Sequence, residues 1–217
     1  IYMILQITVQ KYIPTNAYFY VDDNSRHGFL IDPGAEADKL LRTIEERNFI
    51  IDKILLTHGH FDHIGAANEI QHALGIPVCM QRNGRRYAID PEWNLSKPMT
   101  NSLLTLNDVT YLTDYSDVKL NDTADFKLSM RPVPGHTSDG CIYYSAKDKV
   151  AFVGDSVFLH SYGRTDMPGG NEETLLKNIV KEILTLPDDT TLLTGHSEPT
   201  TVTAEKKMPW YSLYIKK

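Results

Sequence analysis

Apolar and polar positions alternate along the first third of the chain in a pattern that is typical of strands separated by turns. The alternation or a short apolar run occupies residues 3–9 (MILQITV), 16–21 (NAYFYV) and 29–32 (FLID). The segments between and after them hold Asn, Asp, Gly or Pro, which favour turns. We therefore expect an antiparallel meander of three strands.

A helical period comes next. Between residues 35 and 47 the apolar positions recur at helical spacing, and residues 52–56 (DKILL) then predict another strand. A second helix is indicated by apolar residues that end before Gly75 and Pro77; they are Ile64, Ala67, Ile70 and Leu74. Residues 82–124 carry few periodic signals, and we interpret them as a helix fragment and a long surface excursion.

The second half of the chain again passes from strands into a helix. A helix is predicted over residues 172–185 with Asn171 as its N-cap, and a short helix after Thr200. Strands are predicted at 126–133, 141–146, 149–154 and 190–194. Two mixed sheets packed inside with helices on both outer faces account for this order. The predicted fold is therefore an α/β, four-layer αβ/βα sandwich formed by one domain of residues 1–217.

Composition narrows the choice of function. The chain has 217 residues, of which 41% are hydrophobic, and no stretch reaches the roughly 18 apolar residues of a membrane span. The formal net charge of -6 argues against a nucleic-acid partner. The N-terminal segment lacks the features of an export signal, which favours the cytoplasm. Cys79 and Cys141 are expected to be buried apolar residues, because two distant cysteines do not make a disulfide framework.

Four candidate metal ligands follow the strand at residues 52–56, within THGHFDHIG at 57–65. In an extended chain His58 and His60 point the same way and can reach one ion, while the turn directs Asp62 and His63 to another. Imidazole and carboxylate groups suit zinc, iron or manganese. Without such ions, the burial of this many titratable groups would be costly.

Three further candidates share one local pattern, in which a glycine stands beside the ligand. They are His136 in PGHT, Asp155 in VGD and His196 in TGH. Glycine allows a sharp turn and a close approach of the backbone, so each side chain can project into a shared cleft. The full set of seven residues predicts a site for two ions.

This set resembles the metallo-β-lactamase superfamily, whose HxHxDH motif is matched in full, and the likeness covers nearly the whole chain. The resemblance implies that His58, His60 and His136 bind one metal, that Asp62, His63 and His196 bind the second, and that Asp155 bridges them. It also implies that Asp32, in LIDPG, orients the ligand loop. Zinc is the first expectation for the two divalent ions, with iron or manganese as alternatives.

Within the superfamily, the segments GRTDMPGGNEETLLKNI and GHSEPTTVTAEKKMPW are most similar to glyoxalase II-like hydrolases. The expected substrate is a small-molecule acyl thioester of the hydroxyacylglutathione type. Full-length glyoxalase II adds a helical domain that contributes to glutathione binding, whereas 21 residues follow His196 here. A β-lactamase of the common zinc type carries cysteine at the position of Asp155, which does not match.

The expected reaction is hydrolysis by a hydroxide that bridges the two metals, since a metal-bound water loses its proton near neutral pH. Asp62 is predicted to be catalytic, orienting the hydroxide and accepting its proton. Arg85, Tyr87 and Arg164 are candidate substrate-binding residues.

Other functions are kept as alternatives. One is a persulfide dioxygenase with a single iron on His58, His136 and Asp155, and another is a lactone or other ester hydrolase. A non-enzymatic metal-binding module is disfavoured, because a degenerate site should have lost a ligand. A homodimer is left open.

Overall fold

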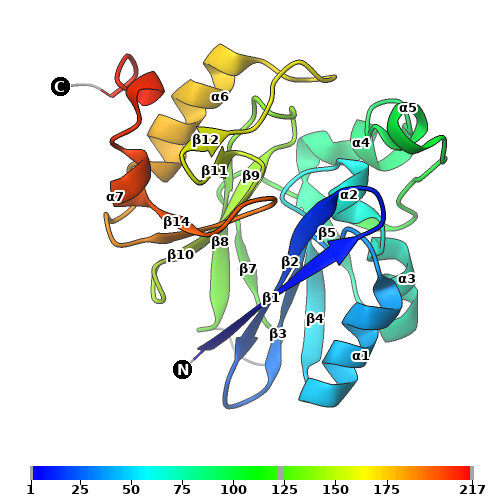
Figure 1. Cartoon of the computed structure of the whole chain (residues 1–217). Coiled ribbons are helices and arrows are strands. Elements are labelled where there is room, and N and C mark those ends of the chain that lie inside the picture. The colour runs from blue at the N-terminus through cyan, green and yellow to red at the C-terminus, as the bar shows by residue number, and fades with distance from the viewer. Residues whose placement is uncertain (1, 122–124, 216–217) are drawn as a thin grey trace.

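The chain builds two mixed sheets, as a computed structural model of residues 2–121 and 125–215 describes it (Figure 1). The first sheet has the order β1-β2-β3-β4-β5-β6 and the second the order β14-β13-β10-β9-β8-β7. Strands of the first sheet are β1 (Tyr2–Gln10), β2 (Pro14–Asp22), β3 (His27–Ile31), β4 (Ile50–Leu55), β5 (Val78–Gln81) and β6 (Val109–Leu112). Those of the second are β7 (Asp117–Lys119), β8 (Lys127–Pro132), β9 (Cys141–Ser145), β10 (Val150–Gly154), β13 (Thr191–Thr194) and β14 (Thr200–Thr201).

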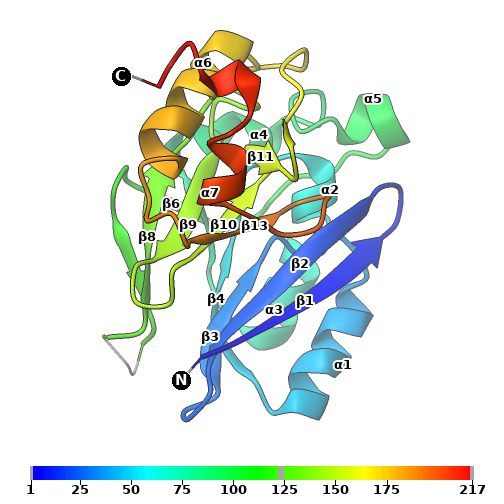
Figure 2. The same cartoon turned by 60° about the vertical axis from the view of Figure 1, so that its left-hand side comes forward.

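The helices cover the two outer faces, and a small hairpin lies beside the second sheet. Figures 1 and 2 show α1 and α3 on the side of the first sheet and α6 and α7 on the side of the second. The helices are α1 (Ala37–Arg47), α2 (Phe61–Ile64), α3 (Ala67–Leu74), α4 (Arg85–Ile89), α5 (Ser96–Thr100), α6 (Glu172–Asn178) and α7 (Val202–Glu205). A π-helical turn, Ile179–Ile183, extends α6, and the hairpin pairs β11 (Val157–Phe158) with β12 (Ser161–Tyr162).

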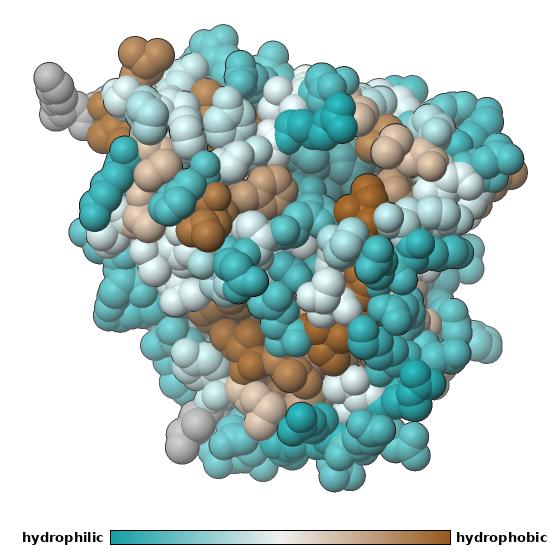
Figure 3. All heavy atoms as spheres, in the orientation of Figure 1, coloured by the Kyte–Doolittle hydropathy of each residue, from teal (hydrophilic) through white to brown (hydrophobic). Residues whose placement is uncertain are grey.

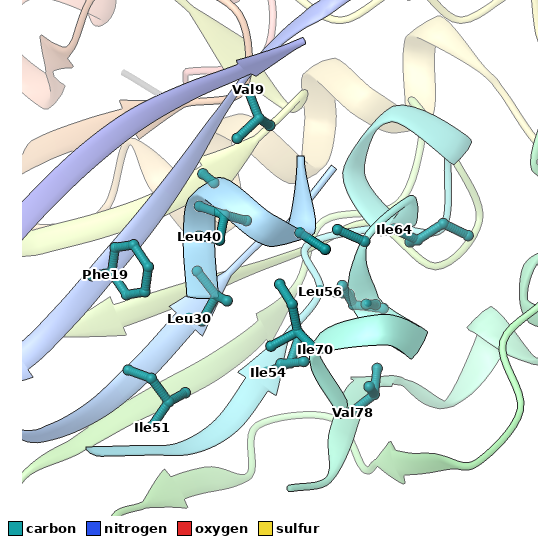
Figure 4. Packing of buried hydrophobic residues seen from close by; sticks show 14 of the residues in the cluster. Val9, Phe19, Leu30, Leu40, Ile51, Ile54, Leu56, Ile64, Ile70 and Val78 are labelled. Carbon is teal, nitrogen blue, oxygen red and sulfur yellow. The ribbon is translucent and has the colours of Figure 1, made fainter. Parts of the chain in front are cut away.

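Three apolar clusters fill the spaces between these layers. In the first cluster, Leu40 of α1 and Ile70 of α3 pack toward Leu30 and Ile54 of the first sheet (Figure 4). The second cluster lies between the sheets and includes Tyr20, Phe29, Tyr143 and Phe152. The third joins the second sheet to α6 and α7. The expected four-layer α/β order is confirmed.

The predicted elements match the structure closely except in the middle of the chain. The first three strands form the expected antiparallel meander, and Asn171 caps α6 by accepting a 2.8 Å hydrogen bond from the backbone N–H of Thr174. Within residues 82–124 the expected helix fragment is present as α4 and α5, whereas the interpretation of the rest as a long surface excursion was wrong. This segment supplies β6 to the first sheet and β7 to the second, both short strands at sheet edges. Residues 122–124 lie outside the described part.

The edge strand β1 leaves part of its apolar surface accessible. Met3, Ile4, Leu5 and Ile7 are half-buried, and a brown patch follows the course of β1 in Figure 3. β1 is the edge strand of the first sheet, where it pairs with β2. Among the described helices, none is both long and apolar enough to cross a membrane.

Truncating a large side chain in the core between the sheets should strongly lower the stability of the fold. The Phe152 ring is 1% exposed, and its centroid lies 5.5 Å from that of Tyr18 and 5.6 Å from that of Tyr20. Phe152→Ala should lower the free energy of unfolding by about 3–5 kcal/mol, because it leaves a cavity. Urea unfolding measures this; Ile50→Ala, at a side chain 50% exposed, is the control. An equal loss in both variants would contradict this view of the core.

Candidate metal centre

Four of the predicted ligands come from the segment that follows β4. His58 and His60 lie in the loop after Leu55, while Asp62 and His63 lie on α2. The helix that the sequence predicted from Ile64 is divided into two. The short helix α2 carries two of the ligands, and α3 begins at Ala67. The break separates the ligand turn from the helix that packs on the sheet.

The division depends on a close approach of two backbone segments. A Cβ atom built on Gly34 would lie 1.6 Å from the backbone oxygen of Asp62, and one on Gly65 would lie 2.2 Å from the backbone oxygen of Gly34. The Ala66 N–H donates a 2.9 Å hydrogen bond to the Pro33 carbonyl. The turn after β3 thus presses directly on α2, which requires glycine at both contact points.

The other three ligands follow strands of the second sheet. His136 comes after β8, Asp155 after β10 and His196 after β13. Gly154 has a φ of 50°, a conformation that glycine adopts without strain, and a Cβ on Gly195 would lie 2.2 Å from Asp155 Oδ1. The glycines beside these ligands therefore allow the backbone to turn and to approach the carboxylate.

All seven side chains converge. His60 Nδ1 lies 3.1 Å from His58 Nε2 and 3.0 Å from His136 Nε2. On the other side, His196 Nε2 lies 3.1 Å from Asp62 Oδ2 and 3.3 Å from His63 Nε2. These are two compact groups of three ligands, His58, His60 and His136, and Asp62, His63 and His196.

Asp155 stands between the two groups. Its Oδ2 lies 3.6 Å from His136 Nε2 and 3.2 Å from His196 Nε2, and its Oδ1 lies 3.3 Å from His63 Nε2. The carboxylate thus faces histidines of both groups, so Asp155 is the residue that could contact ions held by each of them. The donor set of buried imidazoles and carboxylates fits two divalent transition-metal ions.

Outer partners fix the orientation of the rings. The Nδ1 atoms of His136 and His196 lie 2.6 Å from the Arg164 carbonyl and 2.7 Å from the Pro14 carbonyl. His63 Nδ1 lies 3.0 Å from Asp32 Oδ2. Each of these rings therefore directs Nε2 into the site, as expected of histidines whose second nitrogen is held by an oxygen. Asp32 contacts the ring of His63, and its orienting role stays a prediction.

The comparisons with known proteins agree with this geometry. The sequence profile of the Metallo-beta-lactamase superfamily matches residues 12–196. The chain belongs to this superfamily. It is thus a metal-dependent hydrolase of a superfamily that binds divalent metals through His and Asp clusters.

The names of similar proteins point to different hydrolytic activities. The chain is 37% identical to the probable metallo-hydrolase YqgX of Bacillus subtilis, over 89% of this chain and 90% of that protein. It is 33% identical to the hydroxyacylglutathione hydrolase GloC of Haemophilus influenzae, over 85% of this chain and 87% of the relative. Among solved structures, the BLEG-1 B3 metallo-beta-lactamase superposes with a TM-score of 0.90 at 34% identity, covering 97% of this chain and all of that one.

Burial and nearby charges shift the pKa values of the predicted ligand histidines in two opposite directions. Burial lowers the pKa of His58 well below its usual value and that of His60 to about 3, so both rings are neutral and ready to bind a metal. Burial alone would also lower the pKa of His63. The carboxylates of Asp155, Asp62 and Asp32 outweigh it and raise that pKa well above the usual value. In the same way the pKa of His196 rises to about 10, because Asp155 and Asp62 outweigh its burial.

A groove of about 410 Å³ opens onto these ligands, and we call it the site groove. Of the predicted substrate residues, Arg164 lines it. Arg85 does not; its guanidinium lies over the Tyr111 ring, 4.1 Å from the centroid. Tyr87 is fully buried, donates a 2.9 Å hydrogen bond to the Pro168 carbonyl and accepts one from the Ser138 N–H. The structure therefore brings neither Arg85 nor Tyr87 to the groove.

Sequence reasoning missed a buried acid beside the ligand loop. Asp139 is 1% exposed, and a Cβ on Gly59 would lie 3.2 Å from its Oδ2. Burial raises the pKa of this carboxyl to about 7, and Thr137 and the backbone of Gly59 offset only part of the rise. Its place three positions after His136, in HTSDG, was the available signal.

The contact between Gly34 and Asp62 predicts a specific defect. Gly34→Ala should displace α2, because the added methyl group cannot fit, and should lower both the metal content and the melting temperature. Gly75→Ala is the matched control; its φ is 65° but the space around it is open, so the cost is limited to about 1 kcal/mol of backbone strain. Metal analysis and thermal unfolding compare the two. Full metal content in Gly34→Ala would contradict the role given to this contact.

Asp139 predicts a pH-dependent gain in stability on substitution. In the unfolded chain this carboxyl loses its proton near its usual pKa of 3.8, whereas the folded chain keeps it to about pH 7. The wild type therefore loses stability as pH rises through that window. Asp139→Asn cannot ionise, so in metal-free protein its melting temperature should exceed that of the wild type more at pH 7.5 than at pH 5. A difference that is independent of pH would contradict the shifted pKa.

Proposed function

We propose that this chain hydrolyses acyl thioesters, with two divalent ions held by the seven ligands. The proposal rests chiefly on one observation, the two complete groups of three ligands with Asp155 between them. The likeness to GloC supports the thioester class. Zinc is the proposed metal, with iron or manganese as alternatives.

Bound divalent ions would polarise the thioester carbonyl and lower the pKa of a water, so that hydroxide would be available as the nucleophile at neutral pH. The residues of the chain supply position and proton transfer. Asp62 lines the site groove, and its Oδ2 accepts a 3.3 Å hydrogen bond from the Thr15 hydroxyl. We infer that Asp62 orients the attacking water and takes up its proton. A thiolate leaves readily, since its parent thiol has a pKa of about 8.5, so a separate general acid is not needed.

The second ligand group favours hydrolysis over the single-iron dioxygenase. That alternative needs only His58, His136 and Asp155, and it gives no reason for Asp62, His63 and His196 to meet within the same site. A β-lactamase of the common zinc type carries cysteine where this chain has Asp155, whereas BLEG-1, at 34% identity, is called a B3 metallo-beta-lactamase. A β-lactam therefore belongs among the substrates to be tested.

The test is metal analysis of the purified protein together with a panel of substrates. Lactoylglutathione, other thioesters, a lactone and a β-lactam are assayed for hydrolysis, and glutathione persulfide for oxygen uptake. We expect about two metal ions per chain and hydrolysis of thioesters in preference to the other compounds. Oxygen uptake with one iron per chain would overturn the proposal, as would a β-lactam turned over faster than every thioester.

Two substitutions test the roles of the ligands. His58→Ala should lower the metal content and remove activity. Asp62→Ala should lower kcat by about a hundredfold or more, because it removes a proton acceptor as well as a ligand. Both should keep the circular dichroism spectrum of the wild type. His72→Ala and Asp108→Ala, at exposed positions outside the site groove, are the matched controls. Activity that survives both ligand substitutions would refute the mechanism.

A further inference from the structure

The walls of the site groove are mostly apolar, with Ser161, Tyr162 and Arg164 as the polar exceptions, and five of the predicted metal ligands line the groove as well. The walls include Ile13, Phe61, Leu95, Met99, Phe158 and Met167. They come from separate parts of the chain: the loop between β1 and β2, α2, the α5 region, β11, and the loop after β12. A substrate that reaches the ligands therefore meets mainly hydrocarbon and thioether surface.

One wall is attached firmly to the ligand turn. Asn94 is fully buried; its side chain donates hydrogen bonds to the carbonyls of Tyr87 and Leu104, and its own carbonyl accepts one of 2.8 Å from the Phe61 N–H. The next residue, Leu95, has a φ of 68°, which is strained for leucine. The structure thus holds a large apolar side chain in an unfavourable backbone conformation beside the site, a pattern that is common at functional positions.

Apart from the predicted metal ligands, the described lining of the groove holds no positive side chain without an ion-pair partner. Among its described lining residues the single Lys or Arg is Arg164. Its Nε and Nη2 atoms each donate a 2.7 Å hydrogen bond to the Asp166 carboxylate, a bidentate pair that occupies the guanidinium. Near the α5 wall, Lys97 is paired with Glu92 at 2.7 Å.

These observations bear on which thioester fits. A glutathione thioester carries two carboxylates, and each needs a cation or several N–H donors when it leaves water. An aliphatic thiol or acyl chain needs none and gains from contact with the apolar walls. We propose that the site groove selects thioesters whose groups on both sides of the scissile bond are apolar and uncharged, in preference to glutathione thioesters. This inference rests on the proposed thioesterase function.

The direct test compares one acyl group on two thiols, with the metal-loaded protein. Butyryl-glutathione and butyryl-N-acetylcysteamine differ in the charge of the thiol, and we expect kcat/KM to be at least about tenfold higher for the uncharged thioester. Equal values, or a higher value for the glutathione thioester, would overturn this inference and leave the proposed function standing. Hydrolysis of neither thioester, nor of any other in the panel, would overturn both.

Substitutions of Leu95 and Met99, the groove residues in and beside α5, test whether this wall causes the preference for uncharged thioesters. Leu95→Asn suits the left-handed backbone and should fold, since Asn tolerates that conformation; Met99→Gln is a second change of similar size. Each should raise KM for the uncharged thioester by about tenfold, and should raise KM for the glutathione thioester by a smaller factor. Ile89→Gln is the control, at an exposed apolar residue of α4 outside the groove. Equal effects on both substrates in Leu95→Asn and Met99→Gln would overturn the assignment.

Discussion

The buried carboxylate of Asp32 joins the parts of the chain that form the site. Its Oδ1 accepts a 2.8 Å hydrogen bond from the Thr57 N–H, and its Oδ2 accepts one of 2.6 Å from the Thr57 hydroxyl. The same Oδ2 faces His63 Nδ1. One side chain thereby ties the end of β3 to the loop after β4 and to α2. Because these contacts are buried, losing any of them would leave a polar group without a partner, which is costly.

The ligand set combines two electrostatic environments in one small volume. His58, His60 and His136 are buried with lowered pKa values and can receive an ion without releasing protons. His63 and His196 lie among carboxylates that raise their pKa values, so an ion must displace protons from them. The two halves of the site therefore differ in the pH dependence with which they bind metal. Occupation of one half also changes the charge that the other half experiences.

The sequence was sufficient to predict the layer order and the residues that converge. Alternation and short apolar runs identified the inner strands, and HxHxDH together with three glycine-flanked ligands identified the cluster, because these signals are local. The short edge strands β6 and β7 carry too little pattern to be recognised. Arg85 looked like a substrate residue because its charge is visible in sequence, whereas its stacking on Tyr111 depends on tertiary packing. For the same reason, the wall made by Leu95 and Met99 could not be anticipated.

The ligands are divided between the two sheets. Four side chains follow β4 of the first sheet, and three follow strands of the second. Ions bound to both sets would act as cross-links between halves of the molecule that otherwise meet through the apolar layer containing Phe152. Such cross-links oppose the separation of the sheets, which is the motion that exposes that layer to water and to proteases. The catalytic centre would then also govern how long the folded chain survives, and a shortage of metal would shorten its lifetime as well as its activity.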